Sequence, residues 1–83
     1  MHNKAKSSLE RWQTITKYAT WKHFNDVRQT FSTADTVTVA SGRTTVAFNI
    51  GGNHYRLITA IHYNLGKVFV LRVLTHAEYS TDQ

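Results

Sequence analysis

Four residues in the second half of the chain are of types that bind phosphate and move protons: Arg56, Arg72, His76 and Tyr79. The planar fork of donors on a guanidinium group matches the oxygens of a phosphate. An imidazole or phenol beside a bound phosphate can transfer protons during cleavage of a phosphodiester bond. Brought together by the fold, these side chains would form a site that acts on nucleic acid.

Other interpretations of the same residues remain open. Both arginines can be solvated, with the chain ends or Glu78 as counterions. His54, His76 and Glu78 offer three metal ligands, but no spacing motif supports them, so no metal and no cofactor is expected. The Gly51-Gly52 pair is not followed by a helix, so it predicts a turn rather than a phosphate loop.

The elements that must position these residues change in character near residue 35. Before it, apolar residues recur at helical spacing, which predicts a first helix capped by Ser7 or Ser8 and ending near Trp21. A second short helix is expected to begin at Asn25 as its N-cap, with Asp26 in the first turn, and to end near residue 31. The apolar residues expected to pack these helices against the core are Leu9, Trp12, Ile15, Ala19, Phe24, Val27 and Phe31.

After residue 35 the apolar residues alternate with a period of two, which predicts four strands at about 36–40, 44–50, 53–63 and 67–75. Ser41-Gly42 is expected to form the first turn, Gly51-Gly52 a two-residue hairpin loop, and residues 64–66 a three-residue turn with Gly66 left-handed. The predicted fold class is therefore α+β: two N-terminal helices, about 7–31, on one face of a four-stranded antiparallel meander, about 36–76. Residues 1–83 are expected to form one domain.

The turn lengths predict which side chains share a face. The two-residue loop pairs Phe48 with Tyr55 and Val46 with Leu57. The three-residue turn pairs Tyr63 with Lys67, Ile61 with Phe69, Thr59 with Leu71, Leu57 with Val73 and Arg56 with Leu74. One side is then apolar and is covered by the helices. No aromatic residue of the strands is expected on the other side, which carries Asn49, His54, Arg56, Ala60, His62, Arg72 and His76.

On that uncovered side the candidate site is predicted at one end of the sheet. Arg72 lies one diagonal step from Arg56, and His54 lies across from His76. Tyr79 follows just beyond. Two neighbouring guanidinium groups repel each other unless an anion joins them, and a phosphate is the natural candidate.

Composition agrees with a polyanionic partner without requiring one. The 83 residues are 41% hydrophobic and 12% aromatic, and ten Lys and Arg against five Asp and Glu give a net charge of +5. This excess suits RNA or merely a soluble surface. The chain has no cysteine, no apolar run of about 20 residues and no signal peptide, so a cytoplasmic protein with no membrane partner is expected. Lys17, Lys22 and Arg43 either contact RNA backbone or are solvated.

Three stretches of the chain resemble the HigB family of type II toxin–antitoxin toxins. They are VAFNIGGNHYRL at 46–57, VFVLRV at 68–73 and THAEY at 75–79; LERW at 9–12 and Trp21 also resemble the helical part of that family. The resemblance covers about residues 6–79. It implies a RelE-like fold, although residues 1–4 stand where relatives have a first strand, so the sheet is expected to lack that strand.

The resemblance further implies an mRNA interferase, an endoribonuclease that cuts messenger RNA, typically on the ribosome, and is inhibited by a HigA-like helix-turn-helix antitoxin. It places Arg56, Arg72, His76 and Tyr79 in the catalytic set, with Asn53 and His54 nearby; Asn49 neighbours His54 in the predicted register. Cleavage would use the 2′-hydroxyl of the RNA as nucleophile and need no metal. The alternatives are a non-catalytic RNA-binding sheet and a truncated toxin that only binds its antitoxin.

Overall fold

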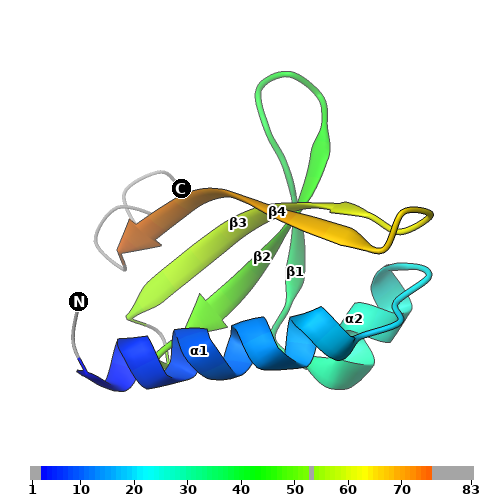
Figure 1. Cartoon of the computed structure of the whole chain (residues 1–83). Coiled ribbons are helices and arrows are strands. Elements are labelled where there is room, and N and C mark those ends of the chain that lie inside the picture. The colour runs from blue at the N-terminus through cyan, green and yellow to red at the C-terminus, as the bar shows by residue number, and fades with distance from the viewer. Residues whose placement is uncertain (1–2, 53, 76–83) are drawn as a thin grey trace.

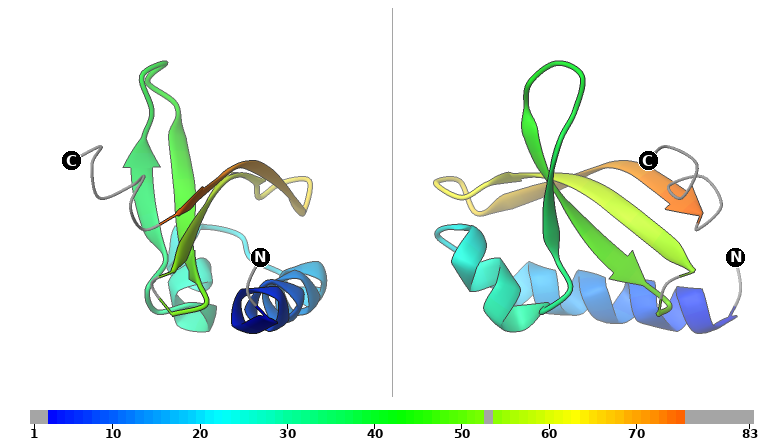
Figure 2. Two further views of the ribbon diagram at one scale, coloured as in Figure 1. Left: turned by 90° about the vertical axis from the view of Figure 1, so that its left-hand side faces the viewer. Right: turned by 180° about the vertical axis from the view of Figure 1, so that it is seen from behind.

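The computed structural model describes residues 3–52 and 54–75. Two helices, α1 (Asn3–Tyr18) and α2 (Phe24–Thr30), precede four strands: β1 (Asp35–Thr38), β2 (Thr44–Ile50), β3 (Tyr55–His62) and β4 (Lys67–Thr75). The strands form one antiparallel sheet in the order β1-β2-β3-β4. Both helices lie against the same side of the strongly twisted sheet (Figures 1 and 2). The predicted α+β class and the meander are confirmed, and within the described residues no strand precedes α1.

The first helix differs from its prediction at both ends. It begins at Asn3, so Ser7 and Ser8 lie inside it and neither is its cap; lysine and alanine in residues 4–6 are good helix formers that extend it. It ends at Tyr18 rather than near Trp21. The physical reason is that the Trp21 indole must enter the core, where it stacks on Phe48 with ring centroids 6.2 Å apart, and a continuing helix would not deliver it there.

The second helix begins two residues earlier than predicted. Its N-cap is His23, which makes no capping hydrogen bond through its side chain, so the prediction of Asn25 as N-cap is wrong. Asp26 does lie in the first turn, as predicted. Its carboxylate accepts a hydrogen bond of 2.9 Å from the backbone N–H of Lys22, so this side chain caps the helix by reaching back from inside it.

The core lies between the helices and the sheet around Phe48, whose side chain is 1% exposed. Its ring centroid is 5.4 Å from that of Trp12 and 5.3 Å from that of Phe31, both in edge-to-face geometry. The buried members of this cluster are Trp12, Trp21, Val27, Ala34, Val46, Phe48, Ile50 and Leu57. The predicted burial of an apolar sheet face under the helices is confirmed.

The β2–β3 connection is longer than predicted. Ile50 pairs with Tyr55, so residues 51–54 form a four-residue loop in place of the expected two-residue one. The loop is closed by the His54 N–H, which donates to the Gly51 carbonyl, and both Gly51 and Gly52 have positive φ. Phe48 therefore pairs with Leu57, and the predicted pairings of Phe48 with Tyr55 and Val46 with Leu57 are wrong.

The β3–β4 connection is also a four-residue loop, 63–66, because His62 rather than Tyr63 pairs with Lys67. Phe69 consequently pairs with Ala60, and the predicted pairings of Ile61 with Phe69 and Thr59 with Leu71 are wrong. A bulge follows between Ile58 and Thr59, where Thr59 pairs with Val70 and Ile58 with Arg72. The bulge takes up Leu71 as the extra residue and restores the predicted pairs of Leu57 with Val73 and Arg56 with Leu74.

The side of the sheet away from the helices is called the open face below. Alternation along the paired strands assigns it these residues: Asp35, Val37, Thr45, Ala47, Asn49, Arg56, Ile58, Ala60, His62, Lys67, Phe69, Arg72 and Leu74. The predicted set of residues implied that the centre of this face is polar, but the centre is apolar. Ala47, Ile58 and Leu74 form a second buried cluster there, with Val37 packed against it, so the charged residues surround an apolar patch.

Candidate functional site

Arg56 and Arg72 share the open face as neighbours on adjacent strands. Arg56 on β3 pairs with Leu74 on β4, and Arg72 pairs with Ile58, so the two arginines stand one diagonal step apart. Backbones of diagonal neighbours are about 7–8 Å apart, which long side chains span easily. These are the pairings that the prediction of adjacent arginines required. Two guanidinium groups in this arrangement can hold one phosphate between them.

Asp35 adds a carboxylate that the sequence analysis missed. Its Oδ2 lies 4.0 Å from Nη2 of Arg56, whose side chain is 20% exposed, whereas that of Asp35 is 65% exposed. Such a long and solvated ion pair contributes about 1 kcal/mol or less. Asp35 therefore helps to orient Arg56 rather than to neutralise a buried charge. Extending the first strand by one residue would have placed Asp35 on this face.

The other predicted site residues are distributed as follows. Asn49 pairs with Arg56 and is half-buried beside it, and His54 is exposed in the loop between β2 and β3 rather than on a strand. Asn53, His76 and Tyr79 lie outside the described residues, so the predicted pairing of His54 with His76 is not described.

The three remaining lysine and arginine candidates do not extend the pair formed by Arg56 and Arg72. Lys17 lies in the last turn of α1, with its Nζ 5.6 Å from the ring centroid of Tyr18. Lys22 lines a pocket with His62, at the opposite end of β3 from Arg56. Arg43 belongs to the exposed turn between β1 and β2. Each of these side chains is exposed. Their contact with RNA stays a prediction.

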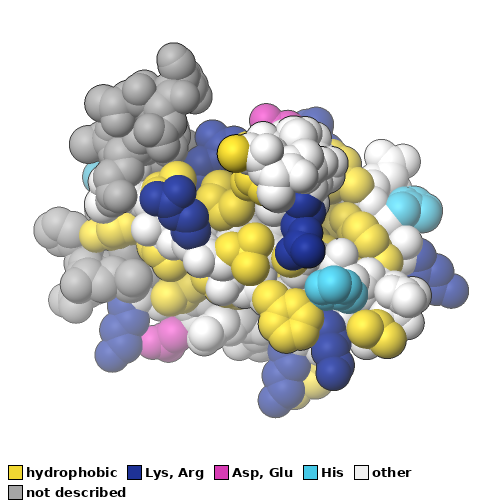
Figure 3. Space-filling view, turned by 90° about the horizontal axis from the view of Figure 1, so that it is seen from above, with side chains coloured by type: hydrophobic (Ala, Val, Ile, Leu, Met, Phe, Trp, Pro, Cys, Tyr) yellow, Lys and Arg dark blue, Asp and Glu magenta, His cyan; other side chains and the backbone are white. Residues whose placement is uncertain are grey.

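Phe69 is an aromatic residue of the open face, where the sequence analysis expected none. Phe69 is 49% exposed, and its ring and the imidazole of His62 pack in edge-to-face geometry, with centroids 5.4 Å apart and an interplanar angle of 82°. The expectation was wrong because the turn after β3 has four residues, which moves Phe69 to the other side of β4. Figure 3 shows hydrophobic, histidine and Lys/Arg side chains together on the face seen from above.

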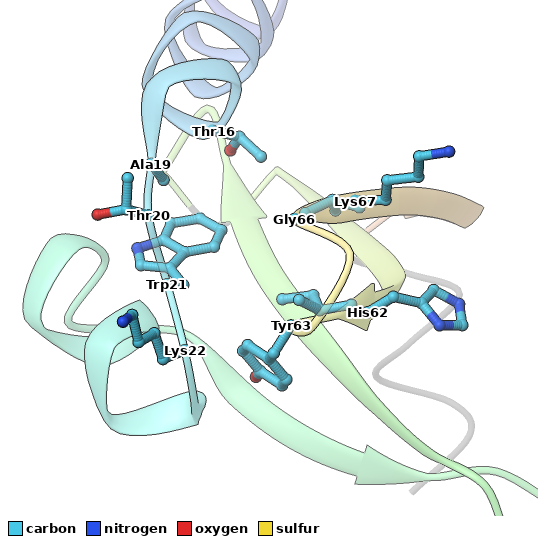
Figure 4. Close-up of a pocket in the computed structure, with 11 residues that line it drawn as sticks. Thr16, Ala19, Thr20, Trp21, Lys22, His62, Tyr63, Gly66 and Lys67 are labelled. Carbon is cyan, nitrogen blue, oxygen red and sulfur yellow. The ribbon is translucent and has the colours of Figure 1, made fainter.

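A pocket among the described residues lies apart from the two arginines, although His62 and Lys67 of the open face border it. It holds about 260 Å³ between the end of α1, the following loop and the β3–β4 turn, and neither Arg56 nor Arg72 lines it. In Figure 4, Trp21 and Tyr63 border the pocket, whereas His62 and Lys67 extend away from them. The lining is largely apolar but includes Lys22, His62 and Lys67, so this pocket lacks the paired guanidinium groups rather than positive charge.

Tyr63 gives this pocket a pH dependence. Burial, and then the negative charge of Asp26, raise the pKa of the Tyr63 phenol above its ordinary value of 10.0. A raised folded-state pKa means that the neutral phenol is favoured in the fold, so its stabilising contribution is present below about pH 10 and is lost as the pH rises through the folded-state pKa. We expect the free energy of unfolding to fall more steeply above about pH 9.5 in the wild type than in Tyr63→Phe. Urea unfolding at a series of alkaline pH values measures both slopes, and equal slopes would contradict the assignment.

Two helices on one side of a four-stranded antiparallel sheet, with the other side left open, is the arrangement of RelE-like proteins. The family model HigB_toxin, described as the RelE-like toxic component of a toxin–antitoxin system, matches residues 5–82, and the chain belongs to this family. The comparison with curated proteins found no match. The protein is thus the toxin of a toxin–antitoxin system, and its family implies an antitoxin as partner.

Two further findings bear on the class of site. Among residues 3–52 and 54–75, no three His, Asp or Glu side chains are grouped closely enough to hold a metal ion. The alternative of a metal held by His54, His76 and Glu78 involves two residues outside that part of the chain. No helix in the described part is long and apolar enough to cross a membrane.

Proposed function

We propose that the protein is an endoribonuclease that cleaves messenger RNA, in the cytoplasm and on the translating ribosome. The observation that carries the proposal is the placement of Arg56 and Arg72 side by side on the open face of a toxin of this family. RNA offers one phosphate per nucleotide, and paired guanidinium groups are suited to hold it. No Asp or Glu occurs in β3 or β4, so these strands present only positive charge to a polyanion.

The proposed reaction uses the RNA as its own nucleophile. A base removes the proton of the 2′-hydroxyl, the 2′-oxygen bonds to the adjacent phosphorus, and the bond from phosphorus to the 5′-oxygen breaks as that oxygen gains a proton. The products are a 2′,3′-cyclic phosphate and a 5′-hydroxyl. Arg56 and Arg72 would stabilise the added negative charge of the phosphorane, and His76 with Tyr79 would transfer the protons.

Asp35 and Asn49 would support this reaction from beside Arg56. The carboxylate of Asp35 restrains the guanidinium from one side, and Asn49 occupies the directly opposite position on β2. Asn53 and His54 follow in the next loop and would contact the neighbouring part of the RNA chain. We propose a helix-turn-helix antitoxin as the inhibitor, since the toxin must be held inactive until it is needed.

The test is to express the chain with and without its antitoxin and to sequence RNA ends from translating and protein-free messenger. We expect growth arrest and new 2′,3′-cyclic or 3′-phosphate ends in translated messenger. Binding of RNA without new ends would favour the alternative of a non-catalytic RNA-binding sheet, for which the exposed ring of Phe69 is a specific argument. Tight antitoxin binding with neither arrest nor new ends would identify an inert toxin.

A further inference from the structure

The exposure of Phe69 needs an explanation because aromatic rings in a chain of this size are mostly used to build its core. In the core, the ring of Phe48 contacts those of Trp12, Trp21 and Phe31, and Trp21 also contacts Phe31. Phe69 instead stands on the open face with half of its side chain exposed. The described contact of its ring is with the imidazole of His62, in edge-to-face geometry. Because 49% of Phe69 is exposed, part of its ring is available to a planar ligand.

The surroundings of Phe69 favour an anionic ligand. Lys67 and Arg72 lie on the same strand and the same face, and His62 lies beside the ring. Arg72 follows Phe69 by three residue steps, about 10 Å along an extended strand, a separation that one or two nucleotides span. A ligand that joins a flat ring to a phosphate at this spacing is a nucleotide of single-stranded RNA, whose bases stack on aromatic side chains.

We propose that Phe69, oriented by His62, is a base-stacking subsite that holds a nucleotide next to the linkage gripped by Arg56 and Arg72. This inference rests on the proposed function, because it takes the arginine pair as the phosphate site. Stacking accepts any base, so the subsite supplies affinity and alignment of the RNA rather than sequence reading. An apolar side chain of a protein partner is the competing occupant, but it would leave Lys67 and Arg72 without an anion to pair with.

The test measures binding of a single-stranded RNA oligonucleotide whose 2′-hydroxyls are methylated, so that it binds without being cut. We expect Phe69→Ala to weaken binding about tenfold to a hundredfold, and Phe69→Trp to retain it. The matched control is Leu65→Ala, which removes an apolar side chain of 63% exposure from the neighbouring turn and should leave binding unchanged. Unfolding midpoints of all variants establish that they are folded.

Two additional readouts separate the subsite from the phosphate site. A 2-aminopurine base in the oligonucleotide should lose fluorescence on binding the wild type and keep it on binding Phe69→Ala, since the loss reports stacking. Phe69→Ala should leave the dependence of affinity on salt unchanged, whereas Arg72→Ala should reduce the slope by about one ion. Unchanged affinity and quenching in Phe69→Ala would overturn the subsite alone, and an unchanged salt slope in Arg72→Ala would overturn the arginine site on which it rests.

Discussion

Arg72→Ala is expected to slow messenger cleavage by about two to three powers of ten and to relieve growth arrest. The reason is that a preorganised charge facing the phosphorane acts mainly in the transition state, where negative charge has accumulated. Arg72 is exposed on β4 and pairs through its backbone with Ile58, so the fold does not depend on its side chain. The rate is measured as the initial appearance of cleaved ends in a translation extract with purified toxin.

Two variants control this result. Arg11→Ala removes the same side chain from the exposed surface of α1, on the other layer of the molecule, and should cleave as the wild type does. Arg72→Lys keeps the charge but loses the planar fork, so its rate should lie between those of wild type and Arg72→Ala. Cleavage by Arg72→Ala at the rate of Arg11→Ala would show that Arg72 takes no part in the reaction.

The placement of Arg56 beside Arg72 could be predicted from the sequence even though the predicted lengths of both hairpin turns were wrong. An error of two residues at Gly51-Gly52 leaves every side chain of β3 on its predicted face, because strands alternate with a period of two. The error of one residue at the next turn reverses the faces only as far as the bulge at Leu71. Beyond the bulge, Arg72 returns to its predicted register with Arg56.

The position of Phe69 on the open face could not be predicted from the sequence, and the reason is the same register error. It lies between the turn and the bulge, in the one segment of β4 where the error of one residue remains uncorrected. The bulge itself leaves no local signal in the sequence, since Leu71 stands in an unbroken run of apolar residues at 68–71. Proline, glycine or a polar residue would have marked the irregularity; an additional leucine does not.

Helix ends show a different limit of prediction. Ser7 and Ser8 are good capping residues, but they compete with a preceding stretch that itself favours helix, and the longer helix wins. The first helix is predicted to end near Trp21, yet the ring of Trp21 enters the core from a loop and its indole N–H donates to Thr30 Oγ1 at 3.1 Å. Local helix propensity before Ser7 therefore set the start of this helix, whereas tertiary packing set its end.

The largest effect on stability is expected for Phe48→Ala. The ring of Phe48 is 1% exposed and contacts Trp12, Trp21 and Phe31, so its removal leaves a cavity bordered by three rigid rings that cannot close around it. Truncation of a buried phenylalanine costs about 3–5 kcal/mol, against a total stability of about 5–15 kcal/mol for a small domain. Urea unfolding followed by tryptophan fluorescence reports this loss directly, because both tryptophans lie against Phe48.

Phe69→Ala is the matched comparison, since it deletes the same atoms from a half-exposed position on the same sheet. It should cost about 1 kcal/mol or less, as is usual away from a packed core. Phe48→Leu provides a graded variant that stays folded if Phe48→Ala does not, and it should fall between the two. Equal losses for Phe48→Ala and Phe69→Ala would mean that the core is not organised around Phe48, and that the open face is covered in solution by something that holds Phe69 as firmly.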